Sequence, residues 1–404
     1  MANSVLIPEW MKERERQRGL ELWAKGEHEL PYRPRETTAE YDAIQKKAKV
    51  PLIGLILRIF GQGLEVIDYM PGDESTHDDL WRIWTANQMR SRQKRLWRAS
   101  LGGGVGYALG LPGDPVPQIK LYSAKNMIAG YQDPEFDEWP MYAAEGTPSD
   151  SSSFLFRVFD EVNAYTLGMN ADGGKVEFIT QDEHGAGVTP VVRFAGDVDT
   201  EGNATGEIEQ LIPIQSSIDQ SKFDLLMTQT FSSFKIRYAT GMAAPETQEE
   251  AERVKLILAQ DRILMSENPE SRFGTLDGTD LLGYIEAGKA SKQELATVAQ
   301  VSPKAIVGAQ ANTANGAEAQ AADEASTMRK LSDFKTIFSP SIGQLFRLTN
   351  ALAGVEGAAG DYSGRVTWRD SEIRSLAQIA DAVAKLADDR LGIPREALWE
   401  MLPV

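Results

Sequence analysis

Few residues of this chain have the types and spacing that catalysis requires. The only histidines are His28, His77 and His184, which are widely spaced and stand beside neither a G-x-S-x-G nor an H-E-x-x-H pattern. A hydrolase or nuclease needs a base, a nucleophile or metal ligands brought together. Asp78 and Asp79 could bind a metal, but such a pair is more typical of the first turn of a helix, where carboxylates interact favourably with the helix dipole. Cysteine is absent, which excludes thiolate metal sites and thiol nucleophiles. The sequence predicts no enzyme, no cofactor and no metal site.

Two further segments match ligand-binding loops only in part. The stretch "SLGGGVGYALG" at 100–110 lacks the G-K-[ST] ending of a phosphate-binding loop, and no acidic residue in a βαβ context supports a dinucleotide site. Its glycines favour a strand that must bend or approach another backbone. The stretch "DVDTEGNATGEIE" at 197–209 has acidic residues at calcium-ligand spacing, but its twelfth position is Ile208, where a bidentate glutamate is needed. We expect an acidic surface loop there.

One dense row of cationic side chains is the strongest local charge feature. It lies on a helix expected from Asp78 to Ala99, opposite an apolar side that includes Leu80, Trp84 and Trp97. The row is either a solvated helix face or a contact with an acidic neighbour or DNA, and the sequence leaves both interpretations open. Its members are Arg90, Arg92, Lys94, Arg95 and Arg98.

Charge and composition limit the possible partners and location. The formal net charge is −17, yet residues 1–100 carry 17 Lys and Arg against 15 Asp and Glu, so the acidity lies in the remainder. Wrapping of nucleic acid over the whole surface is not expected, because phosphate binding needs clustered cations. The longest apolar run, Val50 to Phe60, is too short to span a bilayer and contains Arg58. With no visible signal peptide, we expect a soluble protein of a reducing cytoplasm that does not contact membranes.

The elements that would position these residues form a mixed α+β chain of two or three structural units. In the first half we expect a helix over 38–60, a short strand over 64–70 and a hairpin around "GMNADGG" at 168–174. In the middle, the periodicity predicts a helix over 213–238, whose 26 positions would span roughly 39 Å. A second helix over 280–301 is expected to restart at Ser291, with Glu294 completing a capping box, and to break at Ser302 and Pro303.

Between these two helices the sequence predicts a small module, and after them a third long helix. The module has a short helix at 246–260 and two strands at 262–267 and 271–276. The third helix begins near Asn315 and continues through Pro340, which predicts a kink rather than an end. Its expected core positions are Met328, Leu331, Phe334, Phe338, Ile342, Leu345 and Leu348.

This order of elements, with four local motifs, resembles the bacteriophage portal protein family, the SPP1-type head-to-tail connectors of long-tailed phages. "HGAGVTPVVRF" at 184–194 is similar to the family's strand before the stem, and "EIEQLIPIQSSIDQ" at 207–220 to the start of its stem helix. "ELATVAQVSPKAIVGAQANTANGAEAQAADEA" at 294–325 is similar to the end of the second stem helix and the tunnel loop. "SLAQIADAVAKLADDRLGIPREALWEML" at 375–402 resembles the closing helical pair. The resemblance covers most of the chain from about residue 35 onward.

The resemblance implies the α+β portal fold and its domains. These are the N-terminal part of a mixed wing (1–206), stem helix 1 (207–239), a small β-containing clip (240–280), stem helix 2 (281–302), a tunnel loop (303–316), and a long kinked tunnel helix with the C-terminal part of the wing (317–404), the crown being short or absent.

The resemblance also implies a function. Twelve copies would form a ring at one capsid vertex of the virion, assembled in the cytoplasm of the bacterial host. Double-stranded DNA would pass through the ring without sequence specificity, and the partners would be the major capsid protein, the terminase large subunit and a head-completion or adaptor protein. The channel residues would be Gln310, Asn312, Thr313, Asn315, Lys289, Lys292 and Lys304, with the three lysines expected to contact phosphates. The cationic row from Arg90 to Arg98 is a candidate capsid contact. The alternatives are another oligomeric helical scaffold or adaptor and, less favoured, a hydrolase or nuclease.

Overall fold

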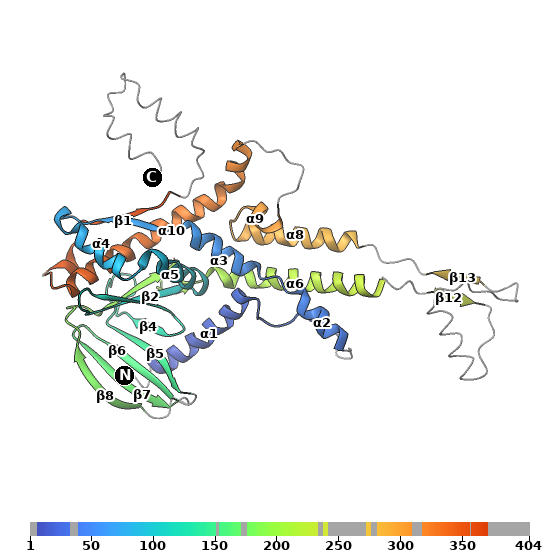
Figure 1. Cartoon of the computed structure of the whole chain (residues 1–404). Coiled ribbons are helices and arrows are strands. Elements are labelled where there is room, and N and C mark those ends of the chain that lie inside the picture. Colours follow the sequence, from blue (N-terminus) through green and yellow to red (C-terminus); the bar gives the residue numbers. More distant parts are fainter. Residues whose placement is uncertain are drawn as a thin grey trace, which may run out of the picture. The chain divides into compact units, whose positions relative to one another are not determined.

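The computed structural model describes residues 6–32, 39–150, 153–170, 176–232, 237–240, 272–275, 281–308, 317–355 and 357–370. Figure 1 shows its helices and strands. The chain divides into two compact units. The first consists of residues 1–28, 51–212 and 296–404, and the second of residues 29–50 and 213–295. Helices and strands both contribute extensively, so the expected α+β class is confirmed.

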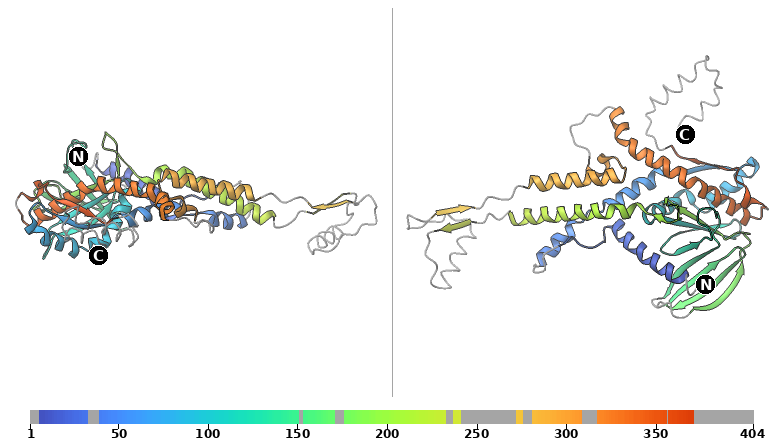
Figure 2. Two further views of the ribbon diagram at one scale, coloured as in Figure 1. Left: turned by 90° about the horizontal axis from the view of Figure 1, so that it is seen from above. Right: turned by 180° about the vertical axis from the view of Figure 1, so that it is seen from behind.

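An antiparallel meander of five strands forms one part of the first unit. The strands pair in chain order, and α1 (Ile7–Lys25) lies against the sheet (Figures 1 and 2). Trp10 of α1 is fully buried and meets the rings of Phe154 and Phe156 edge-on, with centroids 5.4 and 4.8 Å away. The predicted hairpin around 168–174 is confirmed by the pairing of the last two strands. The strands are β4 (Met127–Gly130), β5 (Tyr142–Asp150), β6 (Ser153–Phe159), β7 (Asn163–Asn170) and β8 (Val176–Glu183).

A three-stranded sheet lies at the core of the first unit. Its central strand β2 (Val105–Leu111) pairs with β3 (Gln118–Ser123) and β9 (Val191–Ala195). It is buried almost throughout, and α5 (Met89–Gly103) packs against it. The strand β9 covers the end of the motif at 184–194, where a strand was predicted, and continues to Ala195.

The glycine-rich segment at 100–110 is not a single bent strand. Its first four residues end α5, Gly104 turns with a φ of 88°, and β2 follows. The predicted close approach to another backbone is present, because a Cβ on Gly106 would lie 3.3 Å from the carbonyl oxygen of Leu96 on α5, and it would also lie 2.5 Å from the Oγ of Ser100. The glycines therefore serve helix-to-strand packing.

The helix predicted over 38–60 is two helices. α2 (Ala39–Ala48) ends before Pro51, and α3 (Leu52–Gly63) begins after it. Proline has no N–H for the ladder of a preceding helix but suits the start of a new one, which explains the interruption.

The helix predicted from Asp78 to Ala99 is also two helices. α4 (His77–Ala86) ends at Asn87, and Gln88 adopts a φ of 53° before α5 begins. The Asn87 side chain donates to the Ile83 carbonyl at 2.9 Å and accepts from the Ile119 N–H at 2.8 Å. One side chain thus ends α4 and fixes the start of β3.

The remaining strands of the first unit are short. β1 (Val66–Met70) lies where a strand was predicted and pairs with β14 (Arg365–Trp368). A small hairpin joins β10 (Asp197–Val198) to β11 (Ala204–Thr205). Single turns of 3-10 helix occur at η2 (Glu74–Thr76) and η3 (Ala358–Gly360).

The long helix α10 (Ala317–Leu352) contributes one apolar side to the core. Six of its seven predicted core positions are buried, and Met328 is half-buried. Phe338 stacks on the ring of Trp97 with centroids 5.1 Å apart. The helix continues through Pro340, as predicted.

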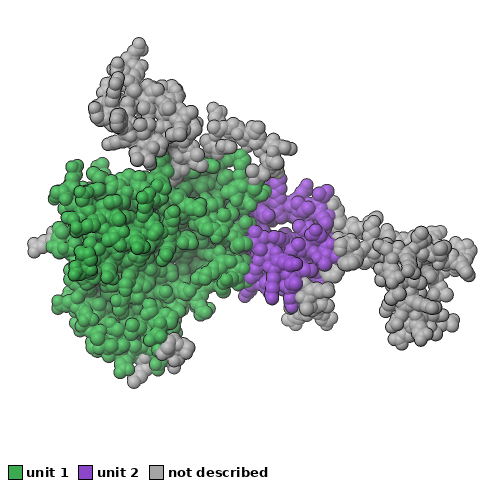
Figure 3. Space-filling view, in the orientation of Figure 1, with its two compact units in different colours: residues 1–28, 51–212, 296–404 green, residues 29–50, 213–295 purple. Residues whose placement is uncertain are grey.

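The second unit contains α2 and parts of two long helices (Figure 3, purple). These are α6 (Glu207–Ser232) from residue 213 and α8 (Leu282–Val298) to residue 295. On α6, Asp219 accepts a hydrogen bond from the Val50 N–H at 3.0 Å, and Gln215 donates to the Val50 carbonyl at 2.7 Å. Both side chains are buried, so the end of the segment after α2 is fixed on α6.

The strands of the second unit correct two predictions. The first two residues of β12 (Arg237–Thr240) were expected to end the helix over 213–238, whereas α6 ends at Ser232. It pairs in full register with β13 (Arg272–Thr275), and Figure 2 shows the two strands side by side. The sequence had assigned 271–276 a partner at 262–267, which lies outside the described residues. Antiparallel pairing satisfies the backbone groups of both strands, which explains why 237–240 leave the helical pattern.

The end of α8 and the segment after it also differ from prediction. Ser291 lies inside α8 and starts no new helix, so the proposed capping box with Glu294 is wrong. The helix ends at Val298, and Gln300 follows with a left-handed φ of 56°. A short helix, α9 (Pro303–Val307), stands where the tunnel loop was expected to begin, because proline fits a first helical turn.

Two predicted helical segments lie outside the described residues, namely 246–260 and 375–402. Among the helices that the structure describes, none has the length and apolar character needed to cross a membrane.

Candidate functional site

The predicted channel residues are described only in part. Lys289 and Lys292 lie one turn apart on α8, are half-exposed, and have no ion-pair partner in the described ranges. Lys304 on α9 differs, because its Nζ forms an ion pair with Asp323 of α10. A phosphate contact at Lys304 would have to replace that pair. The other predicted channel residues, Gln310, Asn312, Thr313 and Asn315, lie outside the described residues.

The cationic row lies on α5, and the predicted division into a basic and an apolar side is confirmed. On the buried side, the carboxamide oxygen of Gln93 accepts from the Val66 N–H at 2.8 Å, which attaches α5 to the start of β1. Leu96 and Trp97 are buried beside it. The opposite side holds the row, where Arg92 is half-exposed and Arg90, Lys94, Arg95 and Arg98 are exposed.

Arg90 is used within the fold. Its Nε lies 3.3 Å from the Glu65 carboxylate, which also receives Arg369 at 2.9 Å. The Glu65 side chain is only 7% exposed, so two cations compensate one buried carboxylate beside β1 and β14. Arg90 is therefore a structural member of the row.

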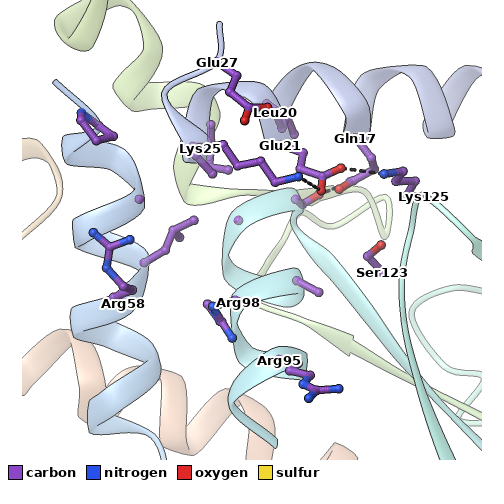
Figure 4. A pocket seen from close by; sticks show the side chains of 18 of the residues that line it. Gln17, Leu20, Glu21, Lys25, Glu27, Arg58, Arg95, Arg98, Ser123 and Lys125 are labelled. Atoms are coloured by element: carbon purple, nitrogen blue, oxygen red, sulfur yellow. Dashed lines mark hydrogen bonds and ion pairs between the residues drawn. The ribbon is translucent and has the colours of Figure 1, made fainter. Parts of the chain in front are cut away.

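Arg95 and Arg98 line a cleft of about 740 Å³ in the first unit. It is formed by α1, α3, α5 and the turn between β3 and β4, as Figure 4 shows. Five cationic side chains and two carboxylates line it, so its net charge is positive although the chain as a whole is acidic. These charged residues are Glu21, Lys25, Glu27, Arg58, Arg95, Arg98 and Lys125.

Close backbone contacts fix the helices around the cleft. Gln17 on α1 is buried and donates to the Gly103 carbonyl at the end of α5, at 2.7 Å. Between α1 and α3, a Cβ on Gly54 would lie 2.2 Å from the Ala24 carbonyl oxygen. A larger residue at position 54 would push these helices apart, so the glycine sets the width of the cleft at that point.

One side of the cleft is internally neutralised. The Glu21 carboxylate receives Lys125 at 2.7 Å and Lys25 at 2.7 Å (Figure 4). The hydrogen bond from Lys125, followed by that from Lys25, lowers the pKa of Glu21 below its ordinary value. The carboxylate is charged at neutral pH and offsets part of the lysine charge.

On the other side of the cleft, the cationic side chains are not paired with carboxylates of the described residues. Arg58 on α3 and Arg95 and Arg98 on α5 have no carboxylate partner in the described part of the chain. A smaller hollow of about 170 Å³ continues along α5 and is lined by Arg92 and Arg95. Burial and the positive charge of Arg95 lower the pKa of Arg92. Crowded guanidinium groups without acidic partners make this side suited to binding an anion.

The histidines have structural contacts. His77, in the first turn of α4, lies 2.8 Å from Asp68 and 3.2 Å from Asp78. The hydrogen bond to Asp68, with that to Asp78, raises the pKa of His77. His28 and His184 are buried. In the described residues no group of three acidic or histidine side chains is arranged to hold a metal ion.

The segment at 197–209 is a surface loop only in part, because β10 and β11 form a short hairpin there and α6 begins at Glu207, where Glu207 and Ile208 are buried. The Asp199 carboxylate accepts from the Glu201 N–H at 3.0 Å and from the Asn203 N–H at 2.8 Å. The Asn203 side chain also donates to this carboxylate, at 3.0 Å. This hydrogen bond, followed by those from the backbone N–H groups, lowers the pKa of Asp199. The carboxylate is used to close its own turn. Asp78 and Asp79 likewise lie in the first turn of α4, as expected.

Comparison with known protein families identifies the family of this chain. The family described as "Phage portal protein, SPP1 Gp6-like" matches residues 6–404. The chain belongs to this family of phage portal proteins. The resemblance drawn from the sequence motifs is therefore confirmed. Portal proteins of this family are structural rather than catalytic, and membership implies an oligomeric ring with capsid and tail partners at the portal vertex of a phage particle.

A solved structure supports the portal fold. A chain from the neck of a native GTA particle, computed with C12 symmetry, is similar with a TM-score of 0.52 at 14% sequence identity. The match covers 90% of this chain and 91% of that chain. At this identity the likeness shows the fold alone. The curated proteins contain no match.

In this portal-family chain, sequence reasoning found only part of the cationic cleft. Arg95 and Arg98 belong to the predicted row, whereas Lys25, Arg58 and Lys125 come from segments far apart in the sequence. One signal for Arg58 was available, because it interrupts the apolar run at 50–60 and must therefore face outward.

Proposed function

We propose that twelve copies of this chain form a closed ring at one vertex of a phage capsid, and that double-stranded DNA enters and leaves through its axial channel. The observation that carries the proposal is the portal-family match over residues 6–404. The C12 symmetry of the similar neck structure supports the number of copies. DNA passes without sequence specificity, since a channel for a whole genome cannot favour particular bases.

The partners follow from this role. The terminase large subunit docks on the segment at 240–280 during packaging, and a head-completion or adaptor protein takes that surface later. The major capsid protein contacts the wing, with the row on α5 as one contact. Assembly takes place in the cytoplasm of the bacterial host, and the finished ring is part of the virion. Family membership supports capsid and tail partners in general, and the proposal assigns them to these surfaces.

Two lysines are the best candidates for contact with DNA. Each cation that neutralises a phosphate adds salt-dependent affinity, so a channel through which DNA must slide needs few of them. Lys289 and Lys292 have no ion-pair partner in the described ranges, whereas Lys304 is paired with Asp323. Reversal of both α8 lysines to glutamate should reduce the DNA retained in particles, and Lys304→Glu should reduce it less. If wild type, the double α8 variant and Lys304→Glu all retained the same amount of DNA, this assignment would be wrong.

The test of the ring is direct. Purified protein should give particles of about twelve times the 44.5 kDa chain mass by mass photometry, and electron micrographs should show rings with a hole wide enough for duplex DNA. A compact monomer at all concentrations would overturn the proposal. A closed ring without a central hole would favour a different oligomeric scaffold.

A further inference from the structure

The cleft between α1, α3 and α5 combines apolar and cationic surface in one cavity. Leu20 and Ala24 from α1, Leu57 from α3 and Ile208 from the start of α6 line it together with the charged residues. Its volume of about 740 Å³ lies in the range of roughly 300–1,000 Å³ that is typical of binding pockets. Apolar walls beside guanidinium groups fit a ligand that carries both apolar and acidic side chains.

The shape of the open side favours an extended ligand. The cleft and the smaller hollow beside it share Arg95, Ala99 and Ser123, so the concave surface continues along α5. Arg58, Arg95 and Arg98 line the cleft, and Arg92 lines the hollow. A single small anion would use one of these groups, whereas a chain with acidic residues at intervals would use several.

We propose that this cleft binds an extended acidic peptide segment of the capsid shell protein. The proposal rests on the portal function, which supplies a shell partner, and it narrows the contact from the whole row on α5 to a defined site. Arg58, Arg95 and Arg98 bind carboxylates of the segment, and an apolar side chain of the segment packs on Leu20 and Leu57. Arg90 is not part of the site, since it serves Glu65. Lys94 lines neither cavity.

Three features favour a peptide over nucleic acid. A phosphate backbone has no apolar group to place against Leu20, Leu57 and Ile208. The open arginines line only one side of the cleft, and Glu27 lines it as well, so a continuous polyanion would meet an unfavourable charge, whereas a peptide can place its few carboxylates on the arginine side only. Duplex DNA is bound by cations spread along a surface rather than gathered in a cavity of this volume.

The experiment measures binding of a defined probe to the purified full-length protein. The probe is a fluorescein-labelled peptide of alternating glutamate and leucine, followed by fluorescence anisotropy. We expect saturable binding, and a loss of about tenfold or more in affinity for Arg95→Glu and for Arg58→Glu, because charge-assisted hydrogen bonds are replaced by repulsion. The same peptide with lysine in place of glutamate should not bind.

Lys94→Glu is the matched control. It makes the same charge change on the same helix, at an exposed position outside both cavities, so it should alter the affinity by less than about twofold. An equal loss in Lys94→Glu and Arg95→Glu would show unspecific attraction and overturn the proposal. Direct binding of a fluorescein-labelled DNA duplex to wild type, stronger than that of the peptide and lost in Arg58→Glu, would make the cleft a nucleic-acid contact instead.

The peptide assay also separates this proposal from the portal function. The assay does not depend on ring formation. If the protein forms no rings but still binds the probe, the peptide site stands and the portal function is wrong. If rings form normally but bind no peptide, the portal function stands and the proposed peptide site is wrong. Thermal unfolding of each variant checks folding, and Arg58 is exposed, so its replacement should leave the fold intact.

Discussion

Two arginines on the same helix show how differently one residue type is used. Arg90 and Arg95 lie five positions apart on α5, and both are exposed. Arg90 is tied to the buried Glu65, which also holds Arg369. Arg95 lines a cleft whose two carboxylates, Glu21 and Glu27, form no ion pair with it. Glu21 is already paired with Lys25 and Lys125. The difference is the nearby carboxylate, which converts a surface cation into a structural one.

The strongest test of the partnered side is removal of its carboxylate. Glu65→Ala would leave Arg90 and Arg369 without their shared partner and remove a contact between the segment before β1 and that after β14. We expect the free energy of unfolding to fall by about 2 kcal/mol, measured by urea denaturation. Glu27→Ala, at a residue that lines the cleft, is the control and should change the free energy of unfolding by less than about 0.5 kcal/mol. Equal effects would show that Glu65 has no special structural role.

Replacing Arg90 or Arg95 by alanine should have a smaller effect on the free energy of unfolding than replacing Glu65. Arg90→Ala should lower the free energy of unfolding by about 1 kcal/mol, because Glu65 keeps only Arg369. Arg95→Ala should leave it unchanged within about 0.5 kcal/mol, since no carboxylate loses a partner and repulsion with Arg92 is relieved. Both are read from the same urea curves. A larger loss for Arg95 than for Arg90 would reverse the comparison.

The neutralised side of the cleft predicts a pH dependence. The pKa of Glu21 is lowered in the folded protein by Lys125 and Lys25, so its ion pairs stabilise the fold above the ordinary carboxyl pKa. That contribution, about 0.5 kcal/mol for partly exposed pairs, is lost as the pH falls through the lowered pKa. Wild type should therefore be more stable than Glu21→Gln at pH 7, and the difference should shrink towards pH 3. A constant difference would mean that charge is not its source.

The sequence predicted the fold class, the family and the two faces of α5, because each depends on local periodicity or on motifs in chain order. It did not predict where α5 begins. The break at Asn87 depends on the Ile119 N–H, which lies 32 positions away in the chain. Likewise the sequence did not predict β12 and extended the helical pattern to Tyr238, because the partner strand β13 is far along the chain and leaves no local signal.

The cleft was predictable only in fragments for the same reason. Local pattern identified Arg95 and Arg98 as outward-facing, and an interrupted apolar run marked Arg58. Their convergence depends on the packing of α3 against α5, where a Cβ on Gly61 would lie 3.6 Å from the Arg98 side chain, and this is a tertiary contact. Local pattern likewise could not separate Arg90 from Arg95, because Glu65 is brought to α5 by the fold.

His77 extends the comparison to a cation whose charge depends on pH. It binds Asp68 of β1, close in sequence to Glu65, and this contact raises its pKa above the ordinary value of 6.5. A raised pKa means that the stabilisation is fully present below pH 6.5 and is lost as the pH rises through the raised value. We expect His77→Gln to be less stable than wild type by about 0.3 kcal/mol at pH 5.5 and equally stable at pH 9, by thermal unfolding. If the difference persisted at pH 9, a neutral hydrogen bond would hold His77 to Asp68, and β1 would depend on permanent cations such as Arg90 alone for its charge pairing.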